Sequence, residues 1–490
     1  MRGAIAAGHP LTAQAGGRVL AEGGNAVDAA VAAALVSWVA ESPLTGPGAG
    51  GFMLVHRAAD RSTRVLDFFT AVPGLGHTSR ERAEMVSVAV DFTSSSSQVF
   101  HIGAGSVAVP GTPIGLEDAH RAYGKLPWHD LFAPAIELAH DGVALNRAQA
   151  YLHDILDGIL RHSDESRAIY GNNGGRFRLG DTFAIPELAS TFEVLRDRGA
   201  RELYDGQLGH RLVAHVQAHG GLLTTQDLRE YRVIRRRPVR TEFRGHDFLS
   251  NPPPSAGGTL IAYGLGLLDD VGEPGSAEAI EALARVMRAQ AEASGWPRQR
   301  LSKLLEERAV VSGGTTHISV VDGEGNAVAL TASTGSGSGV VIPGTGIHLN
   351  NMLGEFSLPR QPRPGARLSS GMSPSLVLRD GRPRLVVGSA GSLRLRGAVM
   401  QVIVNVVQHG LGVREAINRP RVHLDGDALN CEGGHDPAEL RKLEAMGWQL
   451  VRWRRRNLYF GGAAAVEMRD DGTLAAAGDP RRGGAGVIVR

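Results

Sequence analysis

Two glycines, a threonine and a strand-turn-strand pattern constrain the fold of this chain most. After Gly313-Gly314-Thr315, residues 318–321 are typical of a strand, 322–326 of a turn and 327–330 of a return strand. The pattern therefore predicts a β-hairpin whose first strand begins close to Thr315, and a strand holds a terminal residue more rigidly than a loop does.

The bond between Gly314 and Thr315 has the chemistry needed for self-cleavage. Gly314 has no Cβ, so its peptide bond reaches conformations closed to other residues. The Thr315 hydroxyl can attack the Gly314 carbonyl, and hydrolysis of the ester frees an α-amine with a pKa near ~8. A threonine hydroxyl activated by its own amine is a known type of nucleophile. The alternative is that Gly-Gly-Thr is only a loop entering the hairpin.

Composition excludes several classes of protein. The 490 residues are 42% hydrophobic and 21% charged, which is ordinary for a soluble globular protein. A net charge of +2 gives no indication of nucleic-acid binding. The longest apolar run, 29–40, is too short to span a bilayer, so we expect no membrane association. No apolar export signal precedes position 10, which predicts a cytoplasmic protein unless the start codon is misplaced.

Cofactor and metal sites are not expected either. The single cysteine, Cys431, excludes an intrachain disulfide, and the 18 histidines lack the spacing of metal ligands. The loop 46–51 satisfies G-x-G-x-x-G, but it follows a helix and precedes a strand, the reverse of the dinucleotide fingerprint. Tight backbone packing is the better interpretation of these glycines.

Hydrophobic periodicity predicts helices and strands along the whole chain. Residues 13–40 form two predicted helices, interrupted at Gly23-Gly24, with Asn25 capping the second. Strands are predicted at 64–69, 86–92, 99–109, 239–248, 318–321, 327–332, 375–378, 384–387, 463–468 and 474–477. Helices are predicted at 116–123, 131–141, 148–161, 187–198, 207–219, 277–309, 394–408, 412–417 and 436–446. Strands bracketed by helices indicate layered sheets with helices outside.

Eight segments, in the same order, resemble the gamma-glutamyltranspeptidase family nearly end to end. They are 22–30, 50–54, 109–113, 252–258, 315–317, 349–352, 368–374 and 388–392. The resemblance implies an α+β fold, the four-layer αββα sandwich of the N-terminal-nucleophile hydrolases. It also implies a large fragment, 1–314, and a small fragment, 315–490, intertwined in one domain. This self-derived heterodimer would act alone or as a dimer of heterodimers.

The resemblance implies roles for several residues around Thr315. Gly391 and Ser392 align with the Gly-Gly pair whose backbone amides form the family's oxyanion hole, and the second amide survives the change to serine. Ser333 aligns with a threonine that supports the nucleophile. The family pattern continues with an asparagine, and Gly335 falls at that asparagine position here.

The resemblance also implies a substrate-binding set. Ser369 and Ser370 match the Ser-Ser pair that grips the substrate α-carboxylate, and an apparent insertion at Gly371 leaves open which of the two faces the pocket. Glu355 falls where relatives carry an aspartate that binds the α-amine, and it keeps the charge with one more methylene.

Phe69 is the largest departure from the family pattern. Glutamyl-transferring relatives have an arginine there, which pairs with the glutamate α-carboxylate, and phenylalanine cannot form that bidentate pair. We therefore expect another acyl group, or another cation in the arginine's role. Arg394 is the candidate for that cation.

These features predict a self-processing threonine hydrolase or acyltransferase that takes a small-molecule acyl substrate and water or an amine as acceptor. The acyl group is gamma-glutamyl, an unrelated short acid or a group on a biosynthetic intermediate. Lack of an export signal favours an intracellular substrate. Two alternatives stay open: a biosynthetic tailoring enzyme that hydrolyses a carbon–carbon bond next to a carbonyl, and a binding scaffold without turnover.

Overall fold

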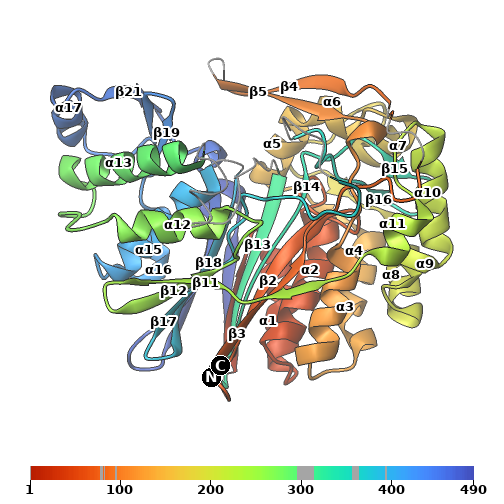
Figure 1. The fold of residues 1–490 in the computed structure, drawn as a ribbon, viewed down its shortest axis with the longest axis horizontal. Coiled ribbons are helices and arrows are strands. Elements are labelled where there is room, and N and C mark those ends of the chain that lie inside the picture. Colours follow the sequence, from red (N-terminus) through yellow and green to blue (C-terminus); the bar gives the residue numbers. More distant parts are fainter. Residues whose placement is uncertain are drawn as a thin grey trace.

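Two antiparallel sheets pack face to face at the centre of the molecule, with helices outside each of them (Figure 1). The computed structural model describes residues 2–77, 81, 83–93, 96–294, 314–355, 363–391 and 394–490. The first sheet has the strand order β10 (Ile234–Arg236), β3 (Ser62–Phe68), β2 (Gly50–Arg57), β14 (Ala327–Gly335), β13 (Gly314–Asp322), β1 (Gly3–Ala7) and β24 (Ala485–Val489). The second has the order β11 (Val239–Phe243), β12 (His246–Ser250), β17 (Ser375–Arg379), β18 (Arg382–Ala390), β22 (Gly462–Met468) and β23 (Leu474–Gly478).

The helices form the two outer layers (Figure 1). Those on the side of the first sheet are α1 (Pro10–Ala21), α2 (Ala26–Ala40), α3 (Thr112–Tyr123), α4 (Ala133–Asp141), α5 (Arg147–Ile155), α6 (Asp157–Leu160), α7 (Asp164–Tyr170), α8 (Pro186–Arg198), α9 (Glu202–Asp205), α10 (Gln207–Ala218) and α11 (Thr225–Glu230). Those on the other side are α12 (Gly257–Gly266), α13 (Ala277–Ser294), α15 (Leu395–Val407), α16 (Val413–Asn418) and α17 (Pro437–Ala445). The four-layer αββα fold expected from the sequence is confirmed.

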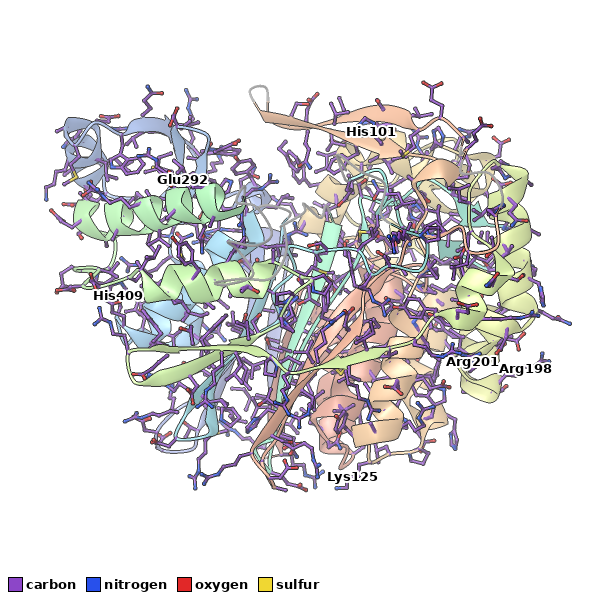
Figure 2. All side chains as sticks on the ribbon, in the orientation of Figure 1. His101, Lys125, Arg198, Arg201, Glu292 and His409 are labelled. Carbon is purple, nitrogen blue, oxygen red and sulfur yellow. The ribbon has the colours of Figure 1, made fainter. Side chains whose placement is uncertain are left out.

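Smaller sheets and ribbons lie at the rim of the sandwich. The three-stranded sheet is β19 (Val422–Asp425), β20 (Ala428–Cys431) and β21 (Gln449–Arg452). The two-stranded ribbons are β4 (Val86–Thr93) with β5 (Ser96–Ile102), β15 (Val341–Ile342) with β16 (Ile347–His348), β6 (Val143–Ala144) with β9 (Thr182–Phe183), and β7 (Gly171–Asn172) with β8 (Gly175–Arg176). Exposed Lys125 and Arg198 mark the periphery, and side chains fill the space between the central strands (Figure 2).

The period of two along each central strand divides its side chains between two cores. On β13, Ile318 and Val320 pack under the helices of the first layer, whereas Val321 packs between the two sheets. On β18, Val387 packs under the helices of the other side, and Val386 joins the layer between the sheets. Because both faces of these strands are buried, apolar residues occur on both faces instead of alternating with exposed polar ones.

The chain ends lie side by side. β1 pairs with β24 in antiparallel register, with Gly3 opposite Val489, and its other edge pairs with β13. The strand that starts at the proposed cut is therefore held between β14 and the N-terminal strand, in the middle of the first sheet. Within the residues described, no helix combines the length and apolar character that a membrane crossing requires.

Most predicted elements are confirmed, with three corrections. Asn25 caps α2 through a capping box with Asp28. The single helix predicted at 148–161 is divided at Leu156 into α5 and α6, because Leu156 has non-helical backbone angles. The strand predicted at 99–109 ends at Ile102, after which residues 104–106 form a 3-10 turn. The single strand predicted at 239–248 is the hairpin β11–β12, because Arg244 and Gly245 turn the chain with φ values of 51° and 73°. The part of the helix predicted beyond residue 294 lies outside the described residues.

Candidate active site

Thr315 lies at the start of β13, in the middle of the first sheet. The register with β14 shifts here: Gly314 is opposite Gly335 and Thr316 is opposite Ala332, so Thr315 faces two residues of β14, Ser333 and Thr334. Such a bulge re-aims the side chain that it contains. Thr315 is fully buried in the intact chain. Gly314, the other half of the predicted cleavage site, is the first residue of the strand.

Gly335 closes this bulge and brings Glu355 close to it. Gly335 has a φ of 75°, and a Cβ there would lie 2.1 Å from Oδ1 of Asn351 and 2.8 Å from Oε1 of Glu355. Only glycine fits such a position without displacing both side chains. The Ser333 hydroxyl accepts a hydrogen bond from the N–H of Gly335 at 2.8 Å. The structure thus brings predicted residues Ser333 and Glu355 to the same end of β13 and β14.

A buried carboxylate, Glu41, lies on the helix side of the nucleophile strand. It follows the last residue of α2, and its oxygens accept hydrogen bonds from the hydroxyls of Thr316 at 2.5 Å and Thr12 at 2.8 Å. Burial raises the pKa of Glu41, although both hydroxyls favour its charged form. Glu41 fixes the side chain next to Thr315 and ties β13 to α1 and α2.

His317 lies on the opposite face of β13, between the sheets, and it is neutral. Its Nδ1 is 2.7 Å from the Thr331 hydroxyl and its Nε2 is 2.9 Å from Ser319 Oγ. Ser319 donates its own proton to the carbonyl of Ala464, so it accepts from Nε2–H, and Nδ1 accepts from Thr331. Burial lowers the pKa of His317 to about 3. This histidine is therefore a poor base for the neighbouring Thr315.

We expect the protein to lose stability in mild acid because several histidines are buried in neutral form. An unfolded histidine has a pKa near ~6.5. Between that value and the lower folded value, only the unfolded chain binds the proton, so stability is complete above pH ~6.5 and falls as the pH falls. Each group costs about 1.4 kcal/mol per pH unit at most. The histidines whose pKa is lowered by burial to about 3 or 4 are His9, His153, His317, His348 and His423.

Urea unfolding at pH 7.5 and pH 5 measures this effect. The five histidines together are expected to lower the free energy of unfolding by several kcal/mol at pH 5, by the linkage between proton binding and folding. The raised pKa values of Glu41 and Asp227 act in the opposite direction, but these are two groups against five. Replacing the exposed His210 by asparagine should leave the loss unchanged. Equal stability at the two pH values would contradict the prediction.

Gly391, the candidate oxyanion residue, ends the second sheet next to this site. It follows β18, is buried, and has a φ of 135°. A Cβ there would lie 2.8 Å from the Cα of Gly461 and 3.7 Å from Nη2 of Arg482. The carbonyl of Gly391 accepts from the N–H of Arg394 at 3.2 Å. Ser392, the predicted second donor, lies outside the described residues.

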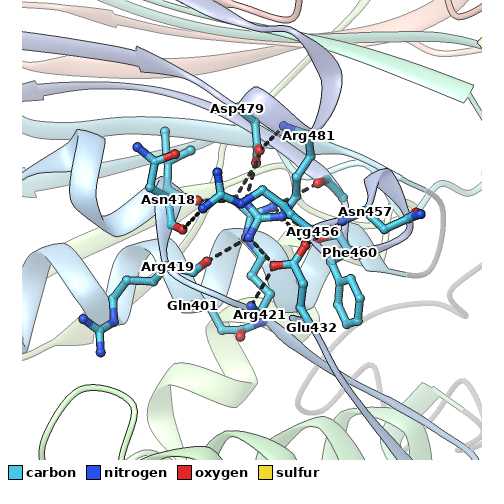
Figure 3. Close-up of polar contacts among 12 residues, drawn as sticks. Gln401, Asn418, Arg419, Arg421, Glu432, Arg456, Asn457, Phe460, Asp479 and Arg481 are labelled. Atoms are coloured by element: carbon cyan, nitrogen blue, oxygen red, sulfur yellow. Dashed lines mark hydrogen bonds and ion pairs between the residues drawn. The ribbon is translucent and has the colours of Figure 1, made fainter. Parts of the chain in front are cut away.

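A buried cluster of two arginines and two carboxylates supports the segment that touches Gly391 (Figure 3). Arg421 donates to the carbonyls of Phe460 and Gly461 and to Oδ2 of Asp479 at 2.6 Å. Arg481 donates to Glu432 Oε1 at 2.7 Å and pairs with Asp479 at 3.1 Å. We call Arg421, Glu432, Asp479 and Arg481 the buried ionic cluster. Through the Gly461 carbonyl it holds the backbone that packs against Gly391.

The predicted serine pair lies against the segment 252–258. Ser369 donates its hydroxyl proton to the carbonyl of Pro254 at 2.6 Å. Ser370 is fully buried, and its hydroxyl accepts from the N–H of Met372 at 3.1 Å. Within the described part of the chain, the Ser370 hydroxyl accepts a hydrogen bond but donates none. Ser370 is therefore the better placed of the two to donate to a carboxylate.

Phe69 and Arg394 are both held by aromatic neighbours. The Phe69 ring is fully buried between the sheets and stacks on Phe52, with ring centroids 5.5 Å apart. The Arg394 guanidinium lies between the rings of Phe92 and Tyr459, 5.3 Å and 4.5 Å from their centroids, and its Nε donates to the Tyr459 carbonyl at 3.0 Å. Burial lowers the pKa of Arg394.

Comparison with known proteins identifies the family. The profile described as Gamma-glutamyltranspeptidase matches residues 12–300 and 292–489. The chain is 32% identical to the glutathione hydrolase proenzyme of Escherichia coli strain K12, covering 98% of this chain and 90% of that protein. It is also 32% identical to the acylase ACY 1 proenzyme of Pseudomonas sp. strain SE83, covering 100% and 94%. This chain belongs to the gamma-glutamyltranspeptidase family.

A solved structure supports the fold of this gamma-glutamyltranspeptidase-family chain. The cephalosporin acylase from Bacillus halodurans superposes with a TM-score of 0.85, at 24% identity, covering 99% of this chain and 95% of that one. The family resemblance and the N-terminal-nucleophile hydrolase fold predicted from the sequence are thus confirmed. The two relatives named above are a glutathione hydrolase and an acylase, and both are proenzymes.

Sequence reasoning missed two charged residues of this family member's site. Glu41 binds Thr316 from 275 positions away, and Arg482 lies against Gly391 although 91 positions separate them. Neither residue belongs to a local pattern that points to Thr315; only the Asp-Pro-Arg-Arg run at 479–482 hints at a charged turn. No cluster of three or more His, Cys, Asp or Glu side chains in the described ranges could hold a metal ion.

Proposed function

We propose that this chain cleaves itself between Gly314 and Thr315 and that Thr315 then catalyses acyl transfer from an amide. The observation that carries the proposal is the position of Thr315 at the bulged start of a central strand, opposite Ser333 and next to Gly335. The nearby histidine, His317, has both ring nitrogens engaged. The freed α-amine of Thr315 is therefore the base.

The reaction has two steps. The Thr315 hydroxyl loses its proton to the α-amine and attacks the carbonyl carbon of the substrate amide, and backbone amides at Gly391 and the following residue stabilise the oxyanion. The amide nitrogen takes the proton and leaves, so that the acyl group remains as an ester on Thr315. Water or an amine then attacks this ester, with the α-amine again acting as base, and releases the acyl product.

The acyl group is one other than a simple gamma-glutamyl group. Position 69 presents a phenylalanine that is stacked on Phe52 between the sheets, so it offers no donor to an α-carboxylate. Glu355 and Ser370 remain as candidate contacts with the substrate. The acceptor is water or an amine, and the active species is the heterodimer of the fragments 1–314 and 315–490.

We further propose that this enzyme has a cytoplasmic location and a biosynthetic substrate.

Intact mass and N-terminal sequencing of the purified protein test the proposal. We expect two fragments that correspond to residues 1–314 and 315–490, with the smaller one beginning at Thr315. An uncut chain, or a small fragment that begins elsewhere, removes the nucleophile and with it the proposed function.

Turnover of gamma-glutamyl p-nitroanilide is expected to be poor. Loss of one charge-assisted hydrogen-bonded pair costs roughly 1.5–3 kcal/mol, which corresponds to roughly 10- to 100-fold in kcat/KM. The cut protein should therefore hydrolyse this anilide more slowly than p-nitroanilides of short acids that lack the α-amino acid head. If the gamma-glutamyl compound is instead the fastest of the series, our interpretation of Phe69 is wrong.

A further inference from the structure

Arg482 is a buried cation that forms no direct ion pair within the described residues. It ends the short 3-10 turn η5 (Pro480–Arg482), and only 7% of its surface is exposed. Its Nε and Nη1 have no hydrogen-bond partner, and in the described part of the chain no carboxylate lies within ion-pair distance of it. Burial lowers the pKa of Arg482 to about 10, a value at which the side chain is still charged at neutral pH.

Two carboxylates, Glu41 and Asp479, raise the pKa of Arg482 through space, and both already accept hydrogen bonds from other groups. Glu41 is bound by the hydroxyls of Thr12 and Thr316. Asp479 belongs to the buried ionic cluster, where Arg421 and Arg481 bind one oxygen each. Backbone N–H groups of residues 463 and 481 use its remaining lone pairs. Asp479 therefore has no lone pair left for Arg482, and Glu41 acts on Arg482 through space, without an ion pair in the described part of the chain.

The surroundings of Arg482 carry further positive charge. Arg394 acts on it through space, and within the described residues the Arg394 side chain contacts a carbonyl and two aromatic rings but no carboxylate. Burying charge without a partner is costly, and the cost falls when an anion binds.

Arg482 also lies beside Gly391, the candidate oxyanion residue. Its Nη2 is 3.7 Å from where a Cβ on Gly391 would be, and its Cδ is 2.4 Å from where a Cβ on Gly462 would be. Gly462 thus makes room for the stem, and the stem directs the guanidinium toward the candidate oxyanion residue. A planar guanidinium has the donor geometry that suits a carboxylate.

We propose that Arg482 binds a carboxylate of the substrate next to Thr315, in place of the arginine that position 69 lacks. The inference rests on the proposed function, because the carboxylate is part of the amide that Thr315 cleaves. It specifies the substrate class as an acyl compound with a free carboxylate. A gamma-glutamyl head would bring its ammonium group into this positive region, which is a second reason to expect poor turnover of gamma-glutamyl amides.

Binding of simple dicarboxylates to the self-cleaved protein tests the assignment without turnover. Succinate, glutarate and adipate, compared with the uncharged succinamide, vary the length and the charge of the probe. We expect at least one dicarboxylate to bind in calorimetry and to raise Tm, with succinamide inert. Arg482→Gln should weaken binding by roughly 10-fold or more, since a charge-assisted hydrogen bond is lost. Arg482→Lys should retain most of it.

Arg396→Gln is the matched control, since Arg396 is a buried arginine of the same region that does not contact Gly391. It should bind the dicarboxylates as the wild type does. Unchanged binding by Arg482→Gln, or no binding of any dicarboxylate by the cut wild type, overturns the assignment. Both results leave the proposed function intact, because that function is tested separately, by whether the chain is cut before Thr315.

A kinetic comparison extends the test to the substrate. Two p-nitroanilides are compared: one made from a dicarboxylic acid, which keeps a free carboxylate, and one made from the monoamide of that acid. The cut wild type should have the lower KM for the anilide with the free carboxylate. Arg482→Gln should lose that preference through a higher KM for the free acid, and intact mass checks that the variant is cut before Thr315. Equal preference in wild type and variant would overturn the assignment.

Discussion

Replacing Thr315 by alanine is expected to leave one uncut chain of 490 residues with no measurable acyl transfer. The variant lacks the hydroxyl that attacks the Gly314 carbonyl, so neither the ester nor the free α-amine forms. Removal of a nucleophile from a catalytic unit costs roughly 10⁴-fold or more in turnover. Denaturing gels and intact mass measure the cut, and hydrolysis of a short acyl anilide measures turnover.

Two variants of the same strand serve as controls. Thr315→Ser keeps a hydroxyl and should still cut, more slowly. Thr316→Ser keeps the hydrogen bond to Glu41 and should cut as the wild type does, which shows that the effect belongs to position 315. If the alanine variant still splits between residues 314 and 315, the assignment of the nucleophile is wrong.

The central strands were predictable because each alternates between two buried layers. The predicted strands 375–378 and 384–387 fall within β17 and β18, and the return strand 327–332 falls within β14. The turn between β11 and β12 was not predictable, because Arg244 takes a positive φ that its residue type does not signal. Periodicity marks a strand as buried on both faces, but it does not say which neighbour covers each face.

The candidate site was predictable only where it is local in sequence. The Gly-Gly-Thr pattern indicated a nucleophile at the start of a strand, and Thr315 lies there. The charges that surround it come from the end of α2 and from η5, near the opposite ends of the chain. Pairing of β1 with β24 brings both ends to the same sheet, and no short-range pattern encodes that contact.

Replacing Glu432 by alanine is expected to destabilise the protein strongly. Glu432 and Arg481 are both fully buried, and Arg481 binds both oxygens of Glu432 and one of Asp479. Removing the carboxylate leaves a buried guanidinium without two of its five hydrogen bonds, which costs roughly 3–5 kcal/mol. The N–H groups of Arg421 and Asn457, which donate to Glu432, lose their acceptors as well.

Urea unfolding of the variant at pH 7.5 measures the loss, and Asp470→Ala is its matched control. Asp470 pairs with Arg379 at 2.8 Å, but the two side chains are 75% and 51% exposed, so that deletion should cost less than about 1 kcal/mol. Each deletion removes the carboxylate of an ion pair, and the difference expected comes from the burial of Glu432 and from the two backbone N–H groups that it also binds. A Glu432→Ala protein as stable as the Asp470→Ala protein would show that the buried ionic cluster contributes no more than a surface pair.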